Sequence, residues 1–165
     1  MAKIIYSILL ILTLITIFLF SSQNGSQSLG LTMKGINKVT NANIEKKEEA
    51  RPGVPKKEEE KTFVDRVIVF VRKSAHFIEY MILGVILMLL LNSFHINMKY
   101  AIMVSISFCF LYACTDEIHQ LFVVGRTGRF TDVLIDTCGS FTGIMLSYII
   151  GRIGRGRKDG RKKEK

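Results

Sequence analysis

The sequence predicts an all-α membrane protein, a four-span transmembrane helix bundle with a polar extracytoplasmic loop between spans 1 and 2. Two observations predict this class. Hydrophobic residues make up 48% of the 165-residue chain, and they are concentrated in four blocks instead of being spread along it as in a soluble domain. A transmembrane helix needs about 20 mainly apolar residues, and each block reaches that length with its flanks.

The first block, residues 4–20, is an unbroken run of apolar and hydroxyl-bearing residues that follows Lys3. A secretory signal peptide has a shorter apolar core, of about 7–15 residues, and a cleavage site between small residues. No such site follows the block in residues 20–24. We therefore expect residues 1–23 to form a retained transmembrane anchor.

The composition changes in residues 24–66, which are rich in Gly, Ser, Asn, Lys and Glu and contain both prolines, Pro52 and Pro55. Basic and acidic residues are nearly balanced in this segment, which is too polar to bury a core. We expect a polar extracytoplasmic loop that tethers span 1 to span 2. A short helix can form on either side of the Pro-Gly-Val-Pro break.

The other three blocks are predicted to form a core of three transmembrane helices within residues 67–151. They cover residues 77–91, 102–115 and 133–150 and contain only two charged residues, Glu79 and Asp136. In the last block, a ridge of small residues lets one helix approach its neighbour closely; it consists of Gly139, Gly143 and Ser147. Because no Cys-x-x-Cys motif is present, we expect the three cysteines to be free, buried thiols.

The formal net charge of +9 comes largely from the end of the chain. Residues 152–165 contain eight basic residues and two acidic ones. A basic tail directly after an apolar span is typical of a cytoplasmic end and can contact anionic lipid. No groove-reading motif accompanies the charge, so we expect the lipid bilayer and no nucleic acid as a partner. Four spans then make a multi-pass protein of the cell membrane with both termini cytoplasmic.

With that topology, polar residues at the ends of all four spans lie at the same extracytoplasmic level. Residues three and four apart share a helix face, and this spacing gives three polar stripes. The stripes are Lys73, His76, Glu79 and Tyr80; Asp116, Glu117, His119 and Gln120; and Asp132 and Asp136.

Ionisable groups at membrane depth usually face the bundle interior and mark function. We expect the stripes to converge on one outward-opening pocket that contains both His76 and His119. The alternative is a structural cluster in which Lys73, Arg126 and Arg129 neutralise the carboxylates and only pin the helices.

The same stripes contain residue types suited to metal binding and acid–base chemistry. The metal candidates are His76, His119 and Asp116, because imidazole and carboxylate ligands suit zinc or another divalent ion. However, Asp-Glu-Ile-His-Gln lacks the second histidine that makes His-Glu-x-x-His a strong zinc signal. The sequence identifies no other cofactor. Burial near lipid can shift the pKa of a histidine or a carboxylate toward values that suit acid–base catalysis. The catalytic candidates are therefore His76, Glu79, Asp116, Glu117 and His119.

A glycine-bracketed turn at residues 124–129 is predicted to present the guanidinium groups of Arg126 and Arg129 outward. Arginine binds phosphate and carboxylate in a bidentate manner, which suits a lipid-linked phosphate or a carboxylate of peptidoglycan or of a glycopeptide. Contact with lipid headgroups alone is the alternative. The residues expected to bind a ligand are Lys73, Tyr80, Gln120, Arg126, Asp132 and Asp136.

Taken in order, these motifs resemble the VanZ-like membrane proteins. The likeness covers most of the chain and rests on Phe20-Ser21-Ser22-Gln23, residues 72–80 with Leu83-Gly84, residues 116–122, Gly125-Arg126-Thr127-Gly128, and residues 132–137 with Gly139. The resemblance implies a multi-pass bacterial membrane protein, and the named member of the family is associated with resistance to teicoplanin-type glycopeptides. The chain departs from the family at Val124, where proline is frequent, and at Asp136, where asparagine is frequent. Residues 44–61 look like an insertion.

Three functional hypotheses follow. The first is an envelope protein whose cluster engages a cell-wall precursor, a lipid headgroup or a glycopeptide and contributes to resistance. The second is a membrane-embedded hydrolase or transferase, with or without a metal, that acts on an envelope lipid with His119 or His76 as general base. The third is a proton or cation relay, for which four spans are few.

Overall fold

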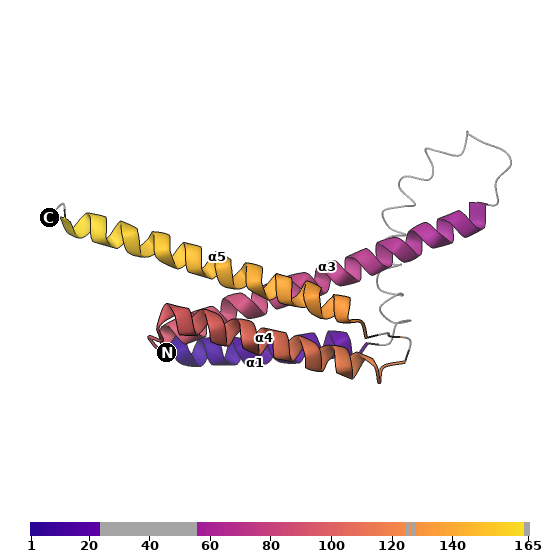
Figure 1. Ribbon diagram of the computed structural model, residues 1–165, viewed down its shortest axis with the longest axis horizontal. Helices are drawn as coiled ribbons and strands as arrows, with labels where there is room; N and C mark the ends of the chain where they lie inside the picture. Colours follow the sequence, from indigo (N-terminus) through magenta and orange to yellow (C-terminus); the bar gives the residue numbers. More distant parts are fainter. Residues whose placement is uncertain (24–55, 125, 127, 164–165) are drawn as a thin grey trace.

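The computed structural model describes the backbone of residues 1–23, 56–124, 126 and 128–163, and the side chains of residues 1–23, 66–124, 126 and 128–153. Four helices make up this part of the chain (Figure 1): α1 (Ala2–Ser21), α3 (Lys56–Ser93), α4 (Met98–Gln120) and α5 (Phe130–Lys163). Residues 24–55, which include most of the predicted loop at 24–66 and most of the predicted insertion at 44–61, lie outside the described residues.

All four helices are long and apolar enough to cross a membrane. The spanning parts are Ala2–Ser21, Arg66–Ser93, Met98–Gln120 and Phe130–Ile153. The predicted four-span, all-α class is therefore confirmed, and the described residues contain no strand. Many large apolar side chains remain exposed, as expected of surfaces that face lipid; on α1 only Ile17 and Ser21 are buried.

Two helices continue beyond their apolar blocks. Residues 56–66, which the sequence analysis assigned to the loop, form the first turns of α3, and the basic tail continues α5 as far as Lys163. Residues 56–61 consist of Lys and Glu only, and both residue types are good helix formers. A polar segment next to a membrane helix can therefore extend the helix.

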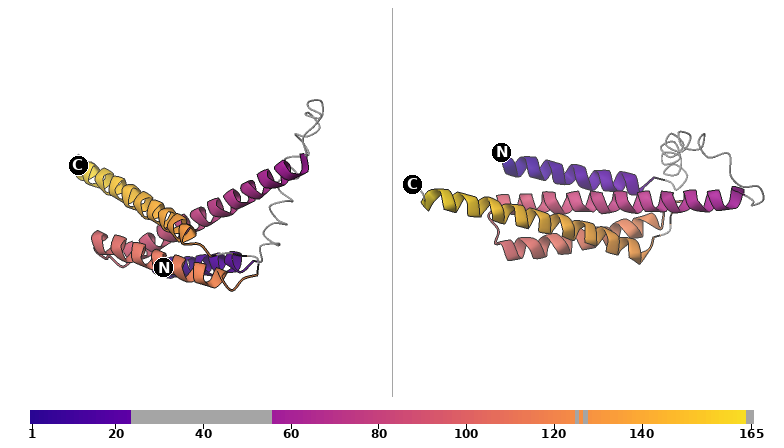
Figure 2. Two further views of the ribbon diagram at one scale, coloured as in Figure 1. Left: turned by 45° about the vertical axis from the view of Figure 1, so that its right-hand side comes forward. Right: turned by 90° about the horizontal axis from the view of Figure 1, so that it is seen from above.

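The helix α3 lies at the centre of the bundle and packs against each of the other three helices. Figure 1 shows α3 and α5 crossing, and Figure 2 shows α1 on one side of α3 with α4 on the other. At the crossing, a Cβ on Gly139 would overlap the carbonyl oxygen of Phe77, and one on Gly143 would overlap that of Met81. Gly139 and Gly143 of the predicted small-residue ridge thus lie in the contact surface of α5 on α3.

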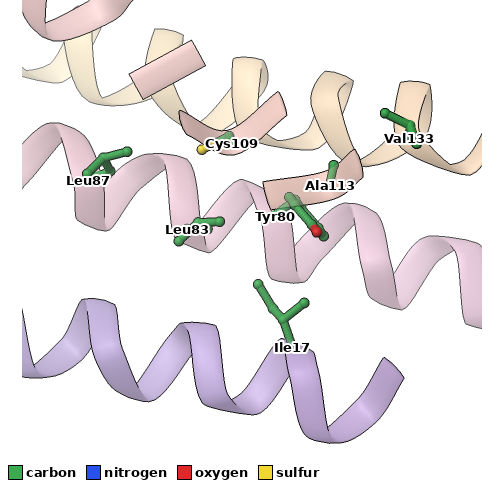
Figure 3. Packing of buried hydrophobic residues seen from close by; sticks show 7 residues of the cluster. All are labelled: Ile17, Tyr80, Leu83, Leu87, Cys109, Ala113 and Val133. Carbon is green, nitrogen blue, oxygen red and sulfur yellow. The ribbon is translucent and has the colours of Figure 1, made fainter. Parts of the chain in front are cut away.

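The hydrophobic core consists of buried apolar side chains on the inward-facing side of each helix. One cluster draws residues from all four helices (Figure 3): Ile17, Tyr80, Leu83, Leu87, Cys109, Ala113 and Val133. The three cysteines are free, as predicted, but the prediction that all three are buried was wrong: Cys109 is buried, Cys114 is partly exposed and Cys138 is exposed. At one end of this core the apolar packing gives way to polar side chains.

Candidate functional site

The helices α1 and α4 finish at the end of the bundle where α5 begins (Figure 1). Polar side chains gather at this end. The spanning part of α3 starts at the same end, so side chains of α3, α4 and α5 meet there beside the last backbone carbonyls of α1. We call the following residues the polar cluster: Arg72, Lys73, His76, Glu79, Asp116, Glu117, Gln120, Arg126, Asp132 and Asp136.

The last turn of α4 supplies three buried polar side chains. Asp116, Glu117 and Gln120 are only 3–6% exposed, and their spacing puts them on one side of the helix. The Gln120 amide nitrogen Nε2 donates to Asp116 Oδ2 at 3.2 Å and to Glu117 Oε1 at 2.9 Å. One amide therefore holds two carboxylates side by side.

Arg126 connects this group to the end of α1. Its Nη1 donates to Gln120 Oε1 at 3.4 Å, its Nε to the Gln23 carbonyl at 3.1 Å and its Nη2 to the Phe20 carbonyl at 2.9 Å. The last carbonyls of a helix lack intrahelical partners and carry partial negative charge, so they attract a guanidinium. Burial lowers the pKa of Arg126, but guanidinium stays charged in proteins.

This arrangement corrects the predicted outward-facing turn. Arg126 is only 8% exposed and its guanidinium points into the protein, whereas the Arg129 side chain is exposed. The Arg129 backbone N–H instead donates to Glu117 Oε2 at 2.9 Å. Gly128 fits here because a Cβ would lie 2.6 Å from the Glu117 carbonyl oxygen.

Two pairs of polar residues face each other across α3 and α5. Lys73 Nζ lies 2.6 Å from Asp132 Oδ1. One turn deeper on both helices, His76 Nδ1 lies 4.0 Å from Asp136 Oδ1, which is too far for a hydrogen bond. Asp136 is 1% exposed, and within the described part of the chain neither of its carboxylate oxygens, nor His76 Nδ1, has a hydrogen-bond partner.

A small cavity of about 10 Å³ opens beside these unpaired groups. Such a volume holds about one water molecule or one ion. The cavity is lined by Arg72, Lys73, His76, Glu117, Gln120, Asp132, Ile135 and Asp136. The predicted stripes on α3, α4 and α5 thus all contribute to it.

His119 does not join His76, contrary to the prediction that both would line one pocket. His119 Nε2 lies 3.0 Å from Ser22 Oγ, and its ring stacks on Phe18 with a centroid distance of 4.6 Å. On a helix, His119 and Glu117 lie on opposite sides of Asp116. When Glu117 faces the cavity, His119 therefore faces α1.

The structure does bring two of the three predicted metal candidates together. His76, Asp116 and Asp136 each offer one ligand atom, and these atoms lie within 4.8 Å of one another. Asp136 is the third member of this group, in place of the predicted His119. The position of Asp136 inside an apolar block, four residues after Asp132, was the signal that could have pointed to it.

The remaining predicted residues lie around this centre. Glu79 is half-buried and within electrostatic range of Asp116 and Arg126. Tyr80 is fully buried in the apolar core and does not line the cavity. Arg72 and Ile135 were not predicted as site residues.

The chain has four helices that can span a membrane, and a buried polar cluster lies at one end of the bundle. Within the described residues, some polar atoms of this cluster have no hydrogen-bond partner. These features define a multi-pass membrane protein with a polar site at the ends of its spans. The chain belongs to the VanZ/LLP1 family, because the model of this family matches residues 4–151, which is most of the chain. No curated protein and no solved structure matches it.

Proposed function

We propose that this protein acts in the bacterial cell envelope, where the polar cluster binds an envelope ligand at the outer face of the cell membrane. The ligand is a cell-wall precursor, a lipid headgroup or a glycopeptide, and binding contributes to resistance to teicoplanin-type glycopeptides. The observation that supports a binding role is the Asp136 carboxylate, which is 1% exposed and lies beside a cavity without a hydrogen-bond partner in the described part of the chain.

Pinning of the helices explains part of the cluster but not Asp136. Lys73 pairs with Asp132, and Arg126 joins α1 to Gln120. An unpaired buried polar group costs about 1–3 kcal/mol, and more when it is charged. A group that only stabilised the bundle would be expected to have a partner, whereas Asp136 and His76 Nδ1 have none among the described residues.

The charges around the cavity indicate what kind of ligand fits. Arg72 and Lys73 are partly exposed and supply positive charge at its edge, whereas Glu117, Asp132 and Asp136 bring carboxylates to its lining. Phosphate and carboxylate groups are the anions that such side chains bind. A lipid-linked precursor or a phospholipid headgroup would bring a phosphate to this level of the membrane, and a glycopeptide would bring a carboxylate.

An outward orientation of the polar cluster is part of the proposal. The basic residues of 152–165 follow the last span and favour a cytoplasmic C-terminus. Four spans then put the N-terminus on the same side and the polar cluster on the other. Envelope precursors and glycopeptides are accessible on that outer side.

Susceptibility to teicoplanin tests the proposal. The gene is deleted and replaced by variants expressed at wild-type level, and the inhibitory concentration is measured. We expect His76→Ala and Asp136→Ala to behave like the deletion. Lys99→Ala, which changes an exposed residue at the opposite end of the bundle, should behave like wild type. Unchanged susceptibility in the deletion and in both site variants would reject the resistance role.

A membrane-embedded hydrolase or transferase is the second candidate, and the grouping of His76, Asp116 and Asp136 favours it. His76 Nδ1 has no hydrogen-bond partner among the described residues and lines the cavity, so it is the better general base. The contact between His119 and Ser22 makes His119 a poorer one. Incubation of purified protein with labelled lipid phosphates tests this alternative, because a binding protein releases no product.

A further inference from the structure

We propose that His76, Asp116 and Asp136 bind a divalent transition-metal ion, with zinc as the best fit, where α3, α4 and α5 meet. One imidazole and two carboxylates form a donor set suited to zinc and related ions. The inference goes beyond the proposed envelope role, because an ion can bind whether or not a larger ligand follows.

The distances between the donor atoms come close to those of a metal site. The three ligand atoms lie within 4.8 Å of one another, and His76 Nδ1 lies 4.0 Å from Asp136 Oδ1. Zinc bonds of about 2.0–2.1 Å place tetrahedral ligands roughly 3.4 Å apart. The side chains therefore need to close in by an ångström or so, which rotation of the two aspartates can provide.

The unpaired atoms are an independent sign that something binds here. Asp136 is 1% exposed, and neither of its oxygens has a hydrogen-bond partner in the parts of the chain described. The same holds for His76 Nδ1. Buried polar groups normally have partners, and one bound cation would serve both residues at once.

The charge of the polar cluster also favours a divalent cation. Its five carboxylates are Glu79, Asp116, Glu117, Asp132 and Asp136, and its three cations are Arg72, Lys73 and Arg126. Asp136 lies within electrostatic range of the other four carboxylates. When all groups are ionised and His76 is neutral, two negative charges remain, which one divalent ion balances.

Neighbouring residues would support the ion and leave one side open. Gln120 donates to Asp116 Oδ2 at 3.2 Å and so orients this ligand, as residues behind metal ligands commonly do. The cavity beside His76 and Asp136 has room for about one water molecule. Three protein ligands with an adjacent water position are typical of catalytic rather than structural zinc sites, and a phosphate or carboxylate oxygen could replace that water.

Metal binding by the purified protein tests the inference. The full chain, prepared without a histidine tag in detergent, is treated with a chelator and re-equilibrated with zinc. Metal content is then measured by mass spectrometry and affinity by titration calorimetry. We expect about one zinc ion per chain, a tenfold or greater loss of affinity in His76→Ala and Asp136→Ala, and no loss in His119→Ala, whose ring faces α1.

A conservative variant separates loss of ligands from loss of fold. Asp136→Asn keeps the size of the side chain and removes its charge, so it should remain monodisperse while zinc no longer raises its Tm. Cobalt should give visible absorption bands in the wild type that are lost in His76→Ala. The inference is overturned if the wild type binds no zinc, or if His119→Ala loses as much affinity as His76→Ala.

The outcomes for the metal and for the proposed function are distinguishable. Zinc binding with unchanged teicoplanin susceptibility would retain the metal site and reject the resistance role. Altered teicoplanin susceptibility in a protein that binds no metal would retain the resistance role and reject the metal site.

Discussion

Replacing Gly143 by alanine should weaken the crossing of α3 and α5. The added Cβ would overlap the Met81 carbonyl oxygen and lie 2.9 Å from its carbonyl carbon and 3.2 Å from its Cα. Ordinary carbon contacts start at about 3.5 Å. Since the obstacle is backbone and cannot rotate away, the two helices must move apart.

The size of the effect follows from that displacement. Inserting an extra carbon into a well-packed core costs about 1–3 kcal/mol. Because the obstacle is backbone, we expect Gly143→Ala to cost at least the middle of this range, and a loss of about 2 kcal/mol lowers the ratio of folded to unfolded protein roughly 30-fold. Because His76 and Asp136 lie on the same two helices, their separation should increase as well.

Unfolding in mixed detergent micelles, followed by circular dichroism, measures the stability loss. Thr142→Val is the matched control, because Thr142 is exposed and valine has nearly the same shape. The Thr142 hydroxyl donates to the Cys138 carbonyl of the same helix. If Gly143→Ala unfolds within about 0.5 kcal/mol of wild type, the close packing described for this crossing is refuted.

Three further predictions concern the polar end of the bundle. Lys73→Asp should lower the free energy of unfolding by about 1 kcal/mol, and adding Asp132→Lys should restore most of it; failure of the double variant to recover would argue against the pair. Arg126→Gln removes the guanidinium bonds to α1 and should lower stability by about 3 kcal/mol, seen as a lower Tm; an unchanged Tm would contradict this. In a cysteine-free chain, Phe122→Cys should react with a membrane-impermeant maleimide on intact cells and Phe94→Cys should not. Both positions are exposed, at opposite ends of the bundle, and the reverse labelling would overturn the proposed orientation.

The sequence determined the fold class because its signals are local. An apolar block of about 20 residues satisfies its own backbone hydrogen bonds as a helix and needs no partner to prefer the membrane. The small residues Gly139 and Gly143 likewise predicted a close helix contact. The spacing of Asp116, Glu117 and Gln120 predicted that they share a helix face, and the Gln120 hydrogen bonds to both carboxylates follow from it.

Only the tertiary structure decided which polar residues meet. Helical spacing fixes the angles between side chains on one helix, but it does not fix how that helix is rotated against its neighbours. The rotation of α4 directs Glu117 to the cavity and His119 to Ser22, so Asp136 and not His119 lies beside His76. Arg126 points inward for a comparable reason, because the backbone carbonyls of Phe20 and Gln23 come within its reach only after α1 has packed into the bundle.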